Sequence, residues 1–299
     1  MGMYLGKEKV APAVKFEVQS MKAYLEAGGK CAYSNATTFE GLWKASEWEN
    51  VTDCSHMFYN CSKLTSIPAM DTSKVTDMNN MFYNCSKITS IPALDTRNVT
   101  NMSDMLNQCS SLTSIPALDT RNVTDMGNML SGCTKLTSIP SMDTSKVTDM
   151  SYLFSNCFAI TSIPALDTSK VTNMNSMFSH CEKITSIPFI NTSNVKSMNY
   201  MFSYCRNLTT VPALDVSNVT GTYNMFVNCS NLESIHMHGM KVYFDISDST
   251  KFTREALVEI LNNLATVTTS QTLSMGSTNI AKLTDADKAI ATGKGWKLV

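Results

Sequence analysis

VTDMNNMFYNCSKITSIPALDTRN, which runs from Val75 to Asn98, is one unit of a repeat that fills most of this chain. Seven further units of the same 24-residue length adjoin it without insertion or deletion, and together they occupy residues 51–242. The units open on Val51, Val75, Val99, Val123, Val147, Val171, Val195 and Val219. A fixed period of this length is typical of a solenoid, in which each repeat is one coil that buries its apolar face against its neighbours. An active site needs one constellation of unlike residues, which eight similar units do not offer.

Each unit predicts one coil with a helical turn, a short strand and two corners. Numbered from its valine, the unit carries apolar residues at positions 1, 4, 7, 8, 11, 14, 17 and 20. Pro92, at position 18, prevents a helix from running through the whole unit. We therefore expect a short helix over Val75–Phe82 and a strand over Ile88–Ile91 that pairs in parallel with its neighbours. The methionines at position 4 are expected to fill the core; they are Met78, Met102, Met126, Met150, Met174 and Met198.

Eight of the ten cysteines occupy position 11 of successive units. Stacked coils lie about 4.8 Å apart, so equivalent thiols form a ladder whose spacing is wider than a disulfide prefers. Buried, reduced thiols are the favoured interpretation, with bridges or a metal site as the alternatives. The ladder consists of Cys61, Cys85, Cys109, Cys133, Cys157, Cys181, Cys205 and Cys229.

The two flanks lack the repeat and are expected to cap the stack. Residues 1–50 form the N-terminal segment and cap, with a helix from Glu17 to Ala27 that Gly28 and Gly29 end. Residues 243–299 predict an α/β cap. Its expected elements are a helix over 254–264 with Thr253 as N-cap, a strand over 271–275, a helix that begins after Thr284 and ends at Gly293, and a strand over 296–299.

The run MFYNCSKITSIPALDTRNVTNM, residues 81–102, resembles the BspA-like leucine-rich repeat family of bacterial surface proteins. This resemblance implies a leucine-rich-repeat-like α/β solenoid, with a parallel β-sheet on one face and short helices on another. It also implies adhesion or protein binding at a bacterial surface. The C-terminal stretch is similar to tails that follow such repeats in gut-bacterial and prophage proteins, and the start MYLGKEKVAP resembles small phage tail or virion proteins.

Composition excludes several classes of function. The net charge is −1 and no cluster of Lys and Arg occurs, which argues against a nucleic-acid partner. No signal peptide and no apolar window long enough to span a membrane is found, so membrane insertion is not expected. No Ser/His/Asp, Cys/His or phosphate-loop constellation is present, and we expect neither an enzyme nor a cofactor.

Two polar patterns have a structural and a functional interpretation. The aspartates at position 21 favour turn formation over calcium binding, because a Thr follows nearly all of them; they are Asp71, Asp95, Asp119, Asp143, Asp167 and Asp215, with Asn191 in one unit. His236 and His238 fall on one face of a strand, but no third ligand is obvious, so surface side chains are favoured over a metal site.

Positions 5, 6, 9, 10, 12 and 13 vary while their neighbours repeat, and several carry Tyr or Arg, the residue types enriched at binding hot spots. They predict a partner-binding surface, concentrated in repeats five to eight, for a protein or glycan; drift at unconstrained exposed positions is the alternative. These residues are Tyr59, Tyr83, Tyr152, Phe158, His180, Tyr200, Tyr204, Arg206 and Tyr223. The sequence therefore favours a non-enzymatic binding module, with a structural spacer of a phage tail or virion as the alternative. The family resemblance implies a location at a bacterial surface or on a phage particle, and a cytoplasmic location is the alternative.

Overall fold

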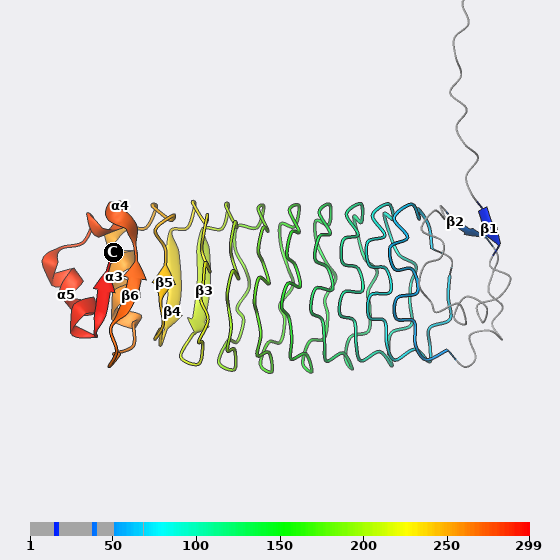
Figure 1. The fold of residues 1–299 in the computed structure, drawn as a ribbon, viewed down its shortest axis with the longest axis horizontal. Coiled ribbons are helices and arrows are strands. Elements are labelled where there is room, and N and C mark those ends of the chain that lie inside the picture. Colours follow the sequence, from blue (N-terminus) through cyan, green and yellow to red (C-terminus); the bar gives the residue numbers. More distant parts are fainter. Residues whose placement is uncertain (1–14, 18–37, 41–50, 68) are drawn as a thin grey trace, which may run out of the picture.

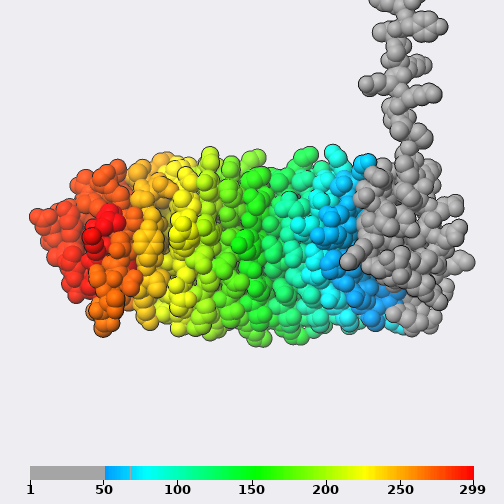
Figure 2. Space-filling view, in the orientation of Figure 1, coloured from blue at the N-terminus to red at the C-terminus, as the bar shows by residue number. Residues whose placement is uncertain are grey.

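Coils of similar outline stack along one long axis and give the molecule the shape of a rod (Figures 1 and 2). This computed structural model describes residues 15–17, 38–40, 51–67 and 69–299. Within the described residues, the helices lie at the C-terminal end of the rod, beyond the last repeat (Figure 1). The architecture is that of a repeat solenoid.

Residues at position 3 of neighbouring repeats face one another along the rod. Seven parallel bridges join the repeats in order, beginning with Asp53 to Asp77 and ending with Ser197 to Gly221. The residues linked by each bridge are 24 apart in the sequence, so each repeat makes one coil. Because every coil contacts only its neighbours, the hydrophobic core runs continuously along the rod and has no single centre.

Successive turns, and not the expected helix, form the segment from position 4 to position 11. Within the repeat residues that the structure describes, 51–67 and 69–242, no helix is present. In the second repeat the amide of Met81 donates to the carbonyl of Met78 at 3.1 Å, and the amide of Cys85 donates to that of Phe82 at 3.0 Å. Each turn has a positive φ at its third residue, as type II turns require: 55° at both Asn80 and Asn84.

Every second amide of this segment, from Met78 to Asn84, donates a hydrogen bond to the next coil, which explains why a helix does not form. Asn80 N–H donates to Ser103 at 3.0 Å and Phe82 N–H donates to Met105 at 2.8 Å. A helix would direct those amides along its own axis, to the residue four positions earlier. The turns instead satisfy them between coils, where an unpaired buried amide would be costly.

The expected strand at Ile88–Ile91 is also absent, and among repeat residues 51–67 and 69–242 strands appear only in the last two repeats. β3 (Thr210–Asp215) and β4 (Ser234–His238) pair in parallel, starting at position 16 of the last two repeats. Their register shifts between Val211 and Leu214, on either side of Pro212. Proline has no N–H to donate to a ladder. The last repeat lacks the position-18 proline and pairs with β3, whereas in every earlier pair of neighbouring repeats both coils carry it, which is the physical reason a continuous sheet does not form there.

The core contains the predicted apolar positions. In the second repeat all eight apolar side chains are buried, from Val75 to Leu94. The position-4 methionines are fully buried, so their expected role as core filling is confirmed. In repeats five to eight, position 8 forms a column of stacked rings in which Phe178 lies 5.7 Å from Phe154 and 5.7 Å from Phe202.

Seven of the ladder thiols are free and buried, as expected. Each donates to the position-8 carbonyl of the preceding coil; Cys157 Sγ lies 3.2 Å from the oxygen of Leu130. Burial raises the pKa of Cys157 to about 12, so this thiol stays protonated at neutral pH. Cys61 departs from the prediction, because it is disulfide-bonded.

The elements outside the repeats fall into two groups. β1 (Lys15–Glu17) pairs in parallel with β2 (Thr38–Glu40). Apart from Glu17, which ends β1, the N-terminal helix expected over 17–27 lies outside the described residues. The C-terminal elements, in chain order, are β5 (Phe244–Asp245), α3 (Arg254–Asn263), β6 (Gln271–Ser274), α4 (Gly276–Ile280), α5 (Asp285–Gly293) and β7 (Trp296–Leu298).

Side-chain caps explain why both predicted C-terminal helices form. Thr253 accepts a hydrogen bond from Ala256 N–H at the start of α3. Thr284 and Asp287 form a reciprocal capping box at the start of α5. We call residues 243–299 the C-terminal unit. It packs against the last repeat, where Gly239 N–H donates to the carbonyl of Asn263 and Ser249 Oγ donates to the carbonyl of Cys229. The sequence did not predict β5 or α4, which are both short.

We expect the C-terminal unit to lose stability in acid through Asp287. Arg254 donates two hydrogen bonds to this carboxylate, at 2.7 and 2.8 Å, and these bonds with the cap at Thr284 lower the pKa of Asp287 to about 2. Because an unfolded aspartate titrates near 3.9, the stabilisation is fully present above about pH 4 and disappears as the pH falls through about 2. Asp287→Asn is therefore expected to lower the melting temperature by a few degrees at pH 6, with the difference from wild type closing towards pH 2.

Asp285→Asn is the matched control, because the Asp285 side chain is fully exposed and its contact to Lys288 is long, at 3.4 Å. A melting-temperature difference for Asp287→Asn that stays constant from pH 6 to pH 2 would contradict this assignment.

Candidate functional site

Seven of the nine residues predicted for the partner surface lie between positions 5 and 10 of their repeats, in the segment of successive turns, and Phe158 and Arg206 follow it directly at position 12. We call positions 4–12 of the coils, taken together along the rod, the turn edge. The structure divides the nine residues into two groups, because repeats three and four contribute none of them. They therefore share an edge of the rod without forming one continuous surface.

The first group belongs to the first two repeats. Tyr59 stacks on Tyr83 with ring centroids 4.8 Å apart, and His56 lies 5.4 Å from Tyr59. Both tyrosines occupy position 9 and are half-buried. They pack against each other along the rod, so much of their ring surface is already in contact with protein.

The second group lies in repeats five to eight and contains two separate sets of ring contacts. His180 stacks on Tyr204 at 4.3 Å, and Phe158 meets the His180 ring edge-on at 6.2 Å. The guanidinium of Arg206 lies 5.6 Å from the Tyr204 ring centroid, in a cation–π contact. Tyr200 and Tyr223 form a second edge-on pair at 5.4 Å. All residues of the second group except Tyr152 therefore contact another member of the group.

A hollow of about 470 Å³ opens within this second group. Its aromatic lining is contributed by Tyr152, His180, Tyr200 and Tyr204. Val227 and small polar residues complete it, and four serines among them are nearly buried: Ser155, Ser176, Ser179 and Ser203, at 2–7% exposure. Phe158, Arg206 and Tyr223 contact the aromatic lining from outside the hollow.

The hollow is uncharged at neutral pH. Its lining contains no Lys, Arg, Asp or Glu among the residues that the structure describes. Partial burial lowers the pKa of His180 below its ordinary value of 6.5. The positive charge of Arg206 lowers this pKa further, and the negative charge of Glu182 opposes the shift. His180 is therefore neutral at pH 7 and offers one ring nitrogen as donor and one as acceptor.

The aromatic residues of the hollow occupy backbone positions that do not favour them. Tyr152 and Tyr200, at position 6, and Tyr204, at position 10, have φ angles of 57°, 57° and 59°. Most residues avoid this left-handed region, which Gly and Asn enter far more easily. Asn80, Asn128 and Asn224 fill position 6 in other repeats. A large side chain at such a position costs stability, and such strain is found most often at functional sites.

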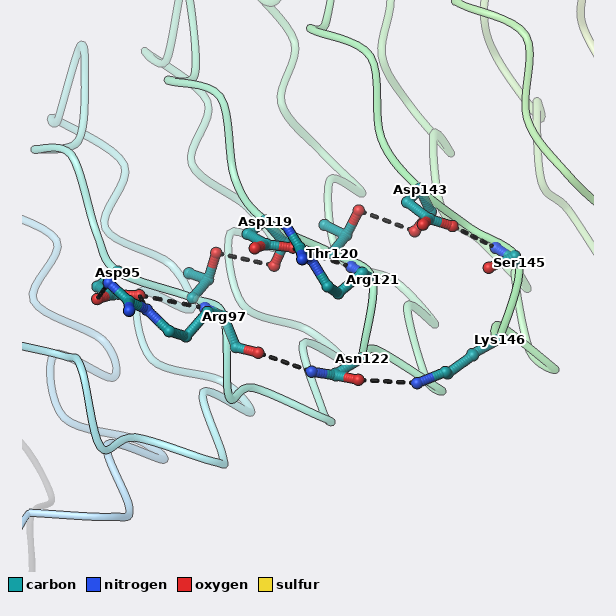
Figure 3. Close-up of polar contacts among 10 residues, drawn as sticks. Asp95, Arg97, Asp119, Thr120, Arg121, Asn122, Asp143, Ser145 and Lys146 are labelled. Carbon is teal, nitrogen blue, oxygen red and sulfur yellow. Dashed lines mark hydrogen bonds and ion pairs between the residues drawn. The ribbon is translucent and has the colours of Figure 1, made fainter.

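The aspartates of position 21 form turns, as the sequence predicts. Each accepts a hydrogen bond from the backbone amide two residues on, as Asp143 does from Ser145 at 3.0 Å (Figure 3). In two repeats an arginine adds an ion pair: Arg97 bonds to Asp95 and holds the pKa of that carboxyl below its ordinary value. These carboxylates therefore already have partners within their own turns.

Neighbouring turns are joined along the rod by the polar residues beside each aspartate. Thr120 Oγ1 donates to the carbonyl of Asp143, and Asn122 Nδ2 donates to that of Arg97 (Figure 3). Position 3 repeats the same turn chemistry, for example in Asp77, which accepts from Asn79 N–H at 2.8 Å. This second row of turns was not predicted from the sequence, although a polar residue at position 3 of most repeats indicates it.

The two histidines of the last repeat lie on one exposed face of β4, and each pairs with a carboxylate. His236 Nδ1 lies 2.7 Å from Glu259 of α3, and His238 Nε2 lies 3.6 Å from Asp215 of β3. Each histidine thus has its own acidic neighbour, which fits surface side chains at the junction with the C-terminal unit.

The chain matches a protein family over most of its length. A family model described as "Mycoplasma protein of unknown function, DUF285" matches residues 30–138, 52–161 and 135–239. No curated protein matches the sequence. One similar solved structure is an internalin (inlF) from Listeria monocytogenes str. 4b F2365, with 15% identity and a TM-score of 0.33, covering 84% of this chain and 73% of that one. A likeness at this TM-score carries no conclusion about function.

Among the described residues, no helix has the length and apolar character needed to cross a membrane.

Proposed function

Because this chain belongs to the DUF285 family, a family of unknown function built here from repeated coils, we propose that it is a non-enzymatic recognition module of the leucine-rich-repeat type. The observation that carries the proposal is the set of aromatic side chains gathered around one hollow of the turn edge, at backbone positions that favour Asn or Gly. The scaffold does not require these side chains there, since other repeats form the same coil without them.

We propose that the partner is a protein or a glycan at a bacterial surface or on a phage particle, and the resemblance to BspA-like repeats supports this proposal. The low charge of the hollow supports a partner other than nucleic acid, whose binding depends on Lys and Arg. Catalysis is not part of the proposal, because the described thiols of the ladder are protonated core residues and the position-21 carboxylates serve as turn acceptors.

Binding of the labelled full-length chain to isolated bacterial envelopes tests this function. Wild type is expected to bind saturably, and Tyr152→Asn/Tyr200→Asn is expected to bind at least about tenfold more weakly, since buried aromatic residues dominate most interfaces. Phe189→Ser is the matched control: Phe189 is 66% exposed but lies at position 19, outside the turn edge. A structural spacer predicts no saturable binding, or binding that the double variant leaves unchanged, and either result would reject the recognition module.

A further inference from the structure

Tyr152 and Tyr200 leave a gap between them that is one coil wide. They occupy position 6 of repeats five and seven, and Ser176, at the same position of repeat six, is small and 5% exposed. Equivalent backbone positions two coils apart are separated by roughly 10 Å, twice the spacing of neighbouring strands. The middle coil does not fill this distance, because the side chain of Ser176 is short and ends at a hydroxyl.

The base of the hollow presents hydroxyl groups that the protein itself does not use. Ser176, Ser179 and Ser203 line the hollow, and their hydroxyls make no hydrogen bond to other residues of the described chain. These hydroxyl oxygens are not among the buried side-chain atoms that lack a partner, so they reach solvent and can bond to water or to a ligand. Asn156 and Asn224, which are half-buried, add amide groups to the lining.

Aromatic faces beside uncharged hydrogen-bonding groups match one class of ligand. A pyranose ring carries C–H groups on its faces and hydroxyls around its edge. The C–H groups are attracted to the electron-rich faces of aromatic rings, and the hydroxyls both donate to and accept from Ser and Asn. A charged sugar or a phosphate would find no counter-ion in this lining.

The size of the hollow also favours a small unit over a protein surface. Its volume of about 470 Å³ lies within the range of roughly 300–1,000 Å³ typical of small-molecule sites. A stable protein interface covers about 800 Å² on each partner, which extends well beyond one such hollow.

We propose that the hollow lined by Tyr152, Ser176, His180, Tyr200 and Tyr204 binds a neutral sugar ring of a surface glycan. This inference rests on the proposed recognition function and names the ligand class of the same site. The two tyrosines hold the faces of the sugar, and the serine and asparagine side chains bond its hydroxyls.

Binding of the full-length chain to immobilised neutral and acidic oligosaccharides tests the ligand class. Wild type is expected to retain neutral oligosaccharides. Tyr152→Asn/Tyr200→Asn is expected to weaken this binding at least about tenfold, and Phe189→Ser is expected to leave it unchanged. Ser176→Tyr gives a second test: the coils on either side already carry Tyr at this position, so the variant is expected to fold, to fill the gap and to abolish binding. Circular dichroism and melting temperature check the fold of each variant.

Three outcomes would overturn the sugar proposal: no retention of any neutral oligosaccharide, retention only of acidic ones, or neutral binding that survives Ser176→Tyr in a folded variant. Treatment of the bacterial envelopes separates this failure from failure of the recognition function. If protease abolishes envelope binding while periodate oxidation of glycans does not, the partner is a protein, and the recognition module stands without the sugar. If untreated envelopes show no saturable binding, the recognition function fails as well.

Discussion

Phe178→Ala is expected to lower the free energy of unfolding by about 3–5 kcal/mol, the usual loss for removing a fully buried phenylalanine. Phe178 has no exposed surface, and its ring stacks between those of Phe154 and Phe202. In a solenoid, stability depends on the contacts of each coil with its two neighbours. The cavity therefore weakens two inter-coil interfaces at once, in the middle of the rod.

Urea denaturation followed by circular dichroism measures this effect. Phe158→Ala is the matched control, because Phe158 is 40% exposed and its loss is expected to change stability by no more than about 0.5 kcal/mol. An equal loss from both substitutions would show that the position-8 column is not the core that holds the coils together.

Trp296→Ala is expected to cost a similar amount but to act at the end of the rod. Trp296, in β7, is 2% exposed, and its indole N–H donates to the carbonyl of Ala265 at 2.8 Å. Truncation to alanine removes a large buried side chain and leaves that carbonyl without its partner. Because β7 belongs to the C-terminal unit, we expect local unfolding to begin in that unit and not in the central repeats.

Hydrogen exchange measured by mass spectrometry locates the loss of protection. In Trp296→Ala we expect faster exchange over residues 244–299 and unchanged exchange over the second to fifth repeats. Lys297→Ala is the control, since the side chain of Lys297 is exposed on the neighbouring position of the same strand. Faster exchange along the whole chain would show that the C-terminal unit and the repeats unfold as one.

The buried positions of the coil were predictable from the sequence, but its backbone was not. Apolar residues at positions 4, 7, 8 and 11 have the spacing of an amphipathic helix. Two successive four-residue turns return side chains to the same side with the same spacing, so the apolar pattern alone does not distinguish them. Asn at positions 6 and 10, as in Asn80 and Asn84, was the distinguishing signal, because Asn tolerates a positive φ.

The C-terminal helices were predictable because local caps specify them. Thr253 and the Thr284–Asp287 pair act within one helical turn of their own sequence. The candidate site had no such local signature. Its aromatic residues stood out as departures from the repeat, whereas the hollow depends on small side chains such as Ser176 and Ser179 in a neighbouring coil. Only stacking brings those residues beside Tyr152 and Tyr200.

The claim that these tyrosines serve recognition and not the fold is tested most directly by the melting temperature of Tyr152→Asn/Tyr200→Asn at pH 7. The variant restores the residue that Asn80, Asn128 and Asn224 provide at position 6 of other repeats. Because Asn adopts the left-handed conformation more easily than Tyr, we predict a melting temperature equal to or above that of wild type. A melting temperature several degrees below wild type would contradict the account, because it would make the tyrosines part of the packing that holds the coils together.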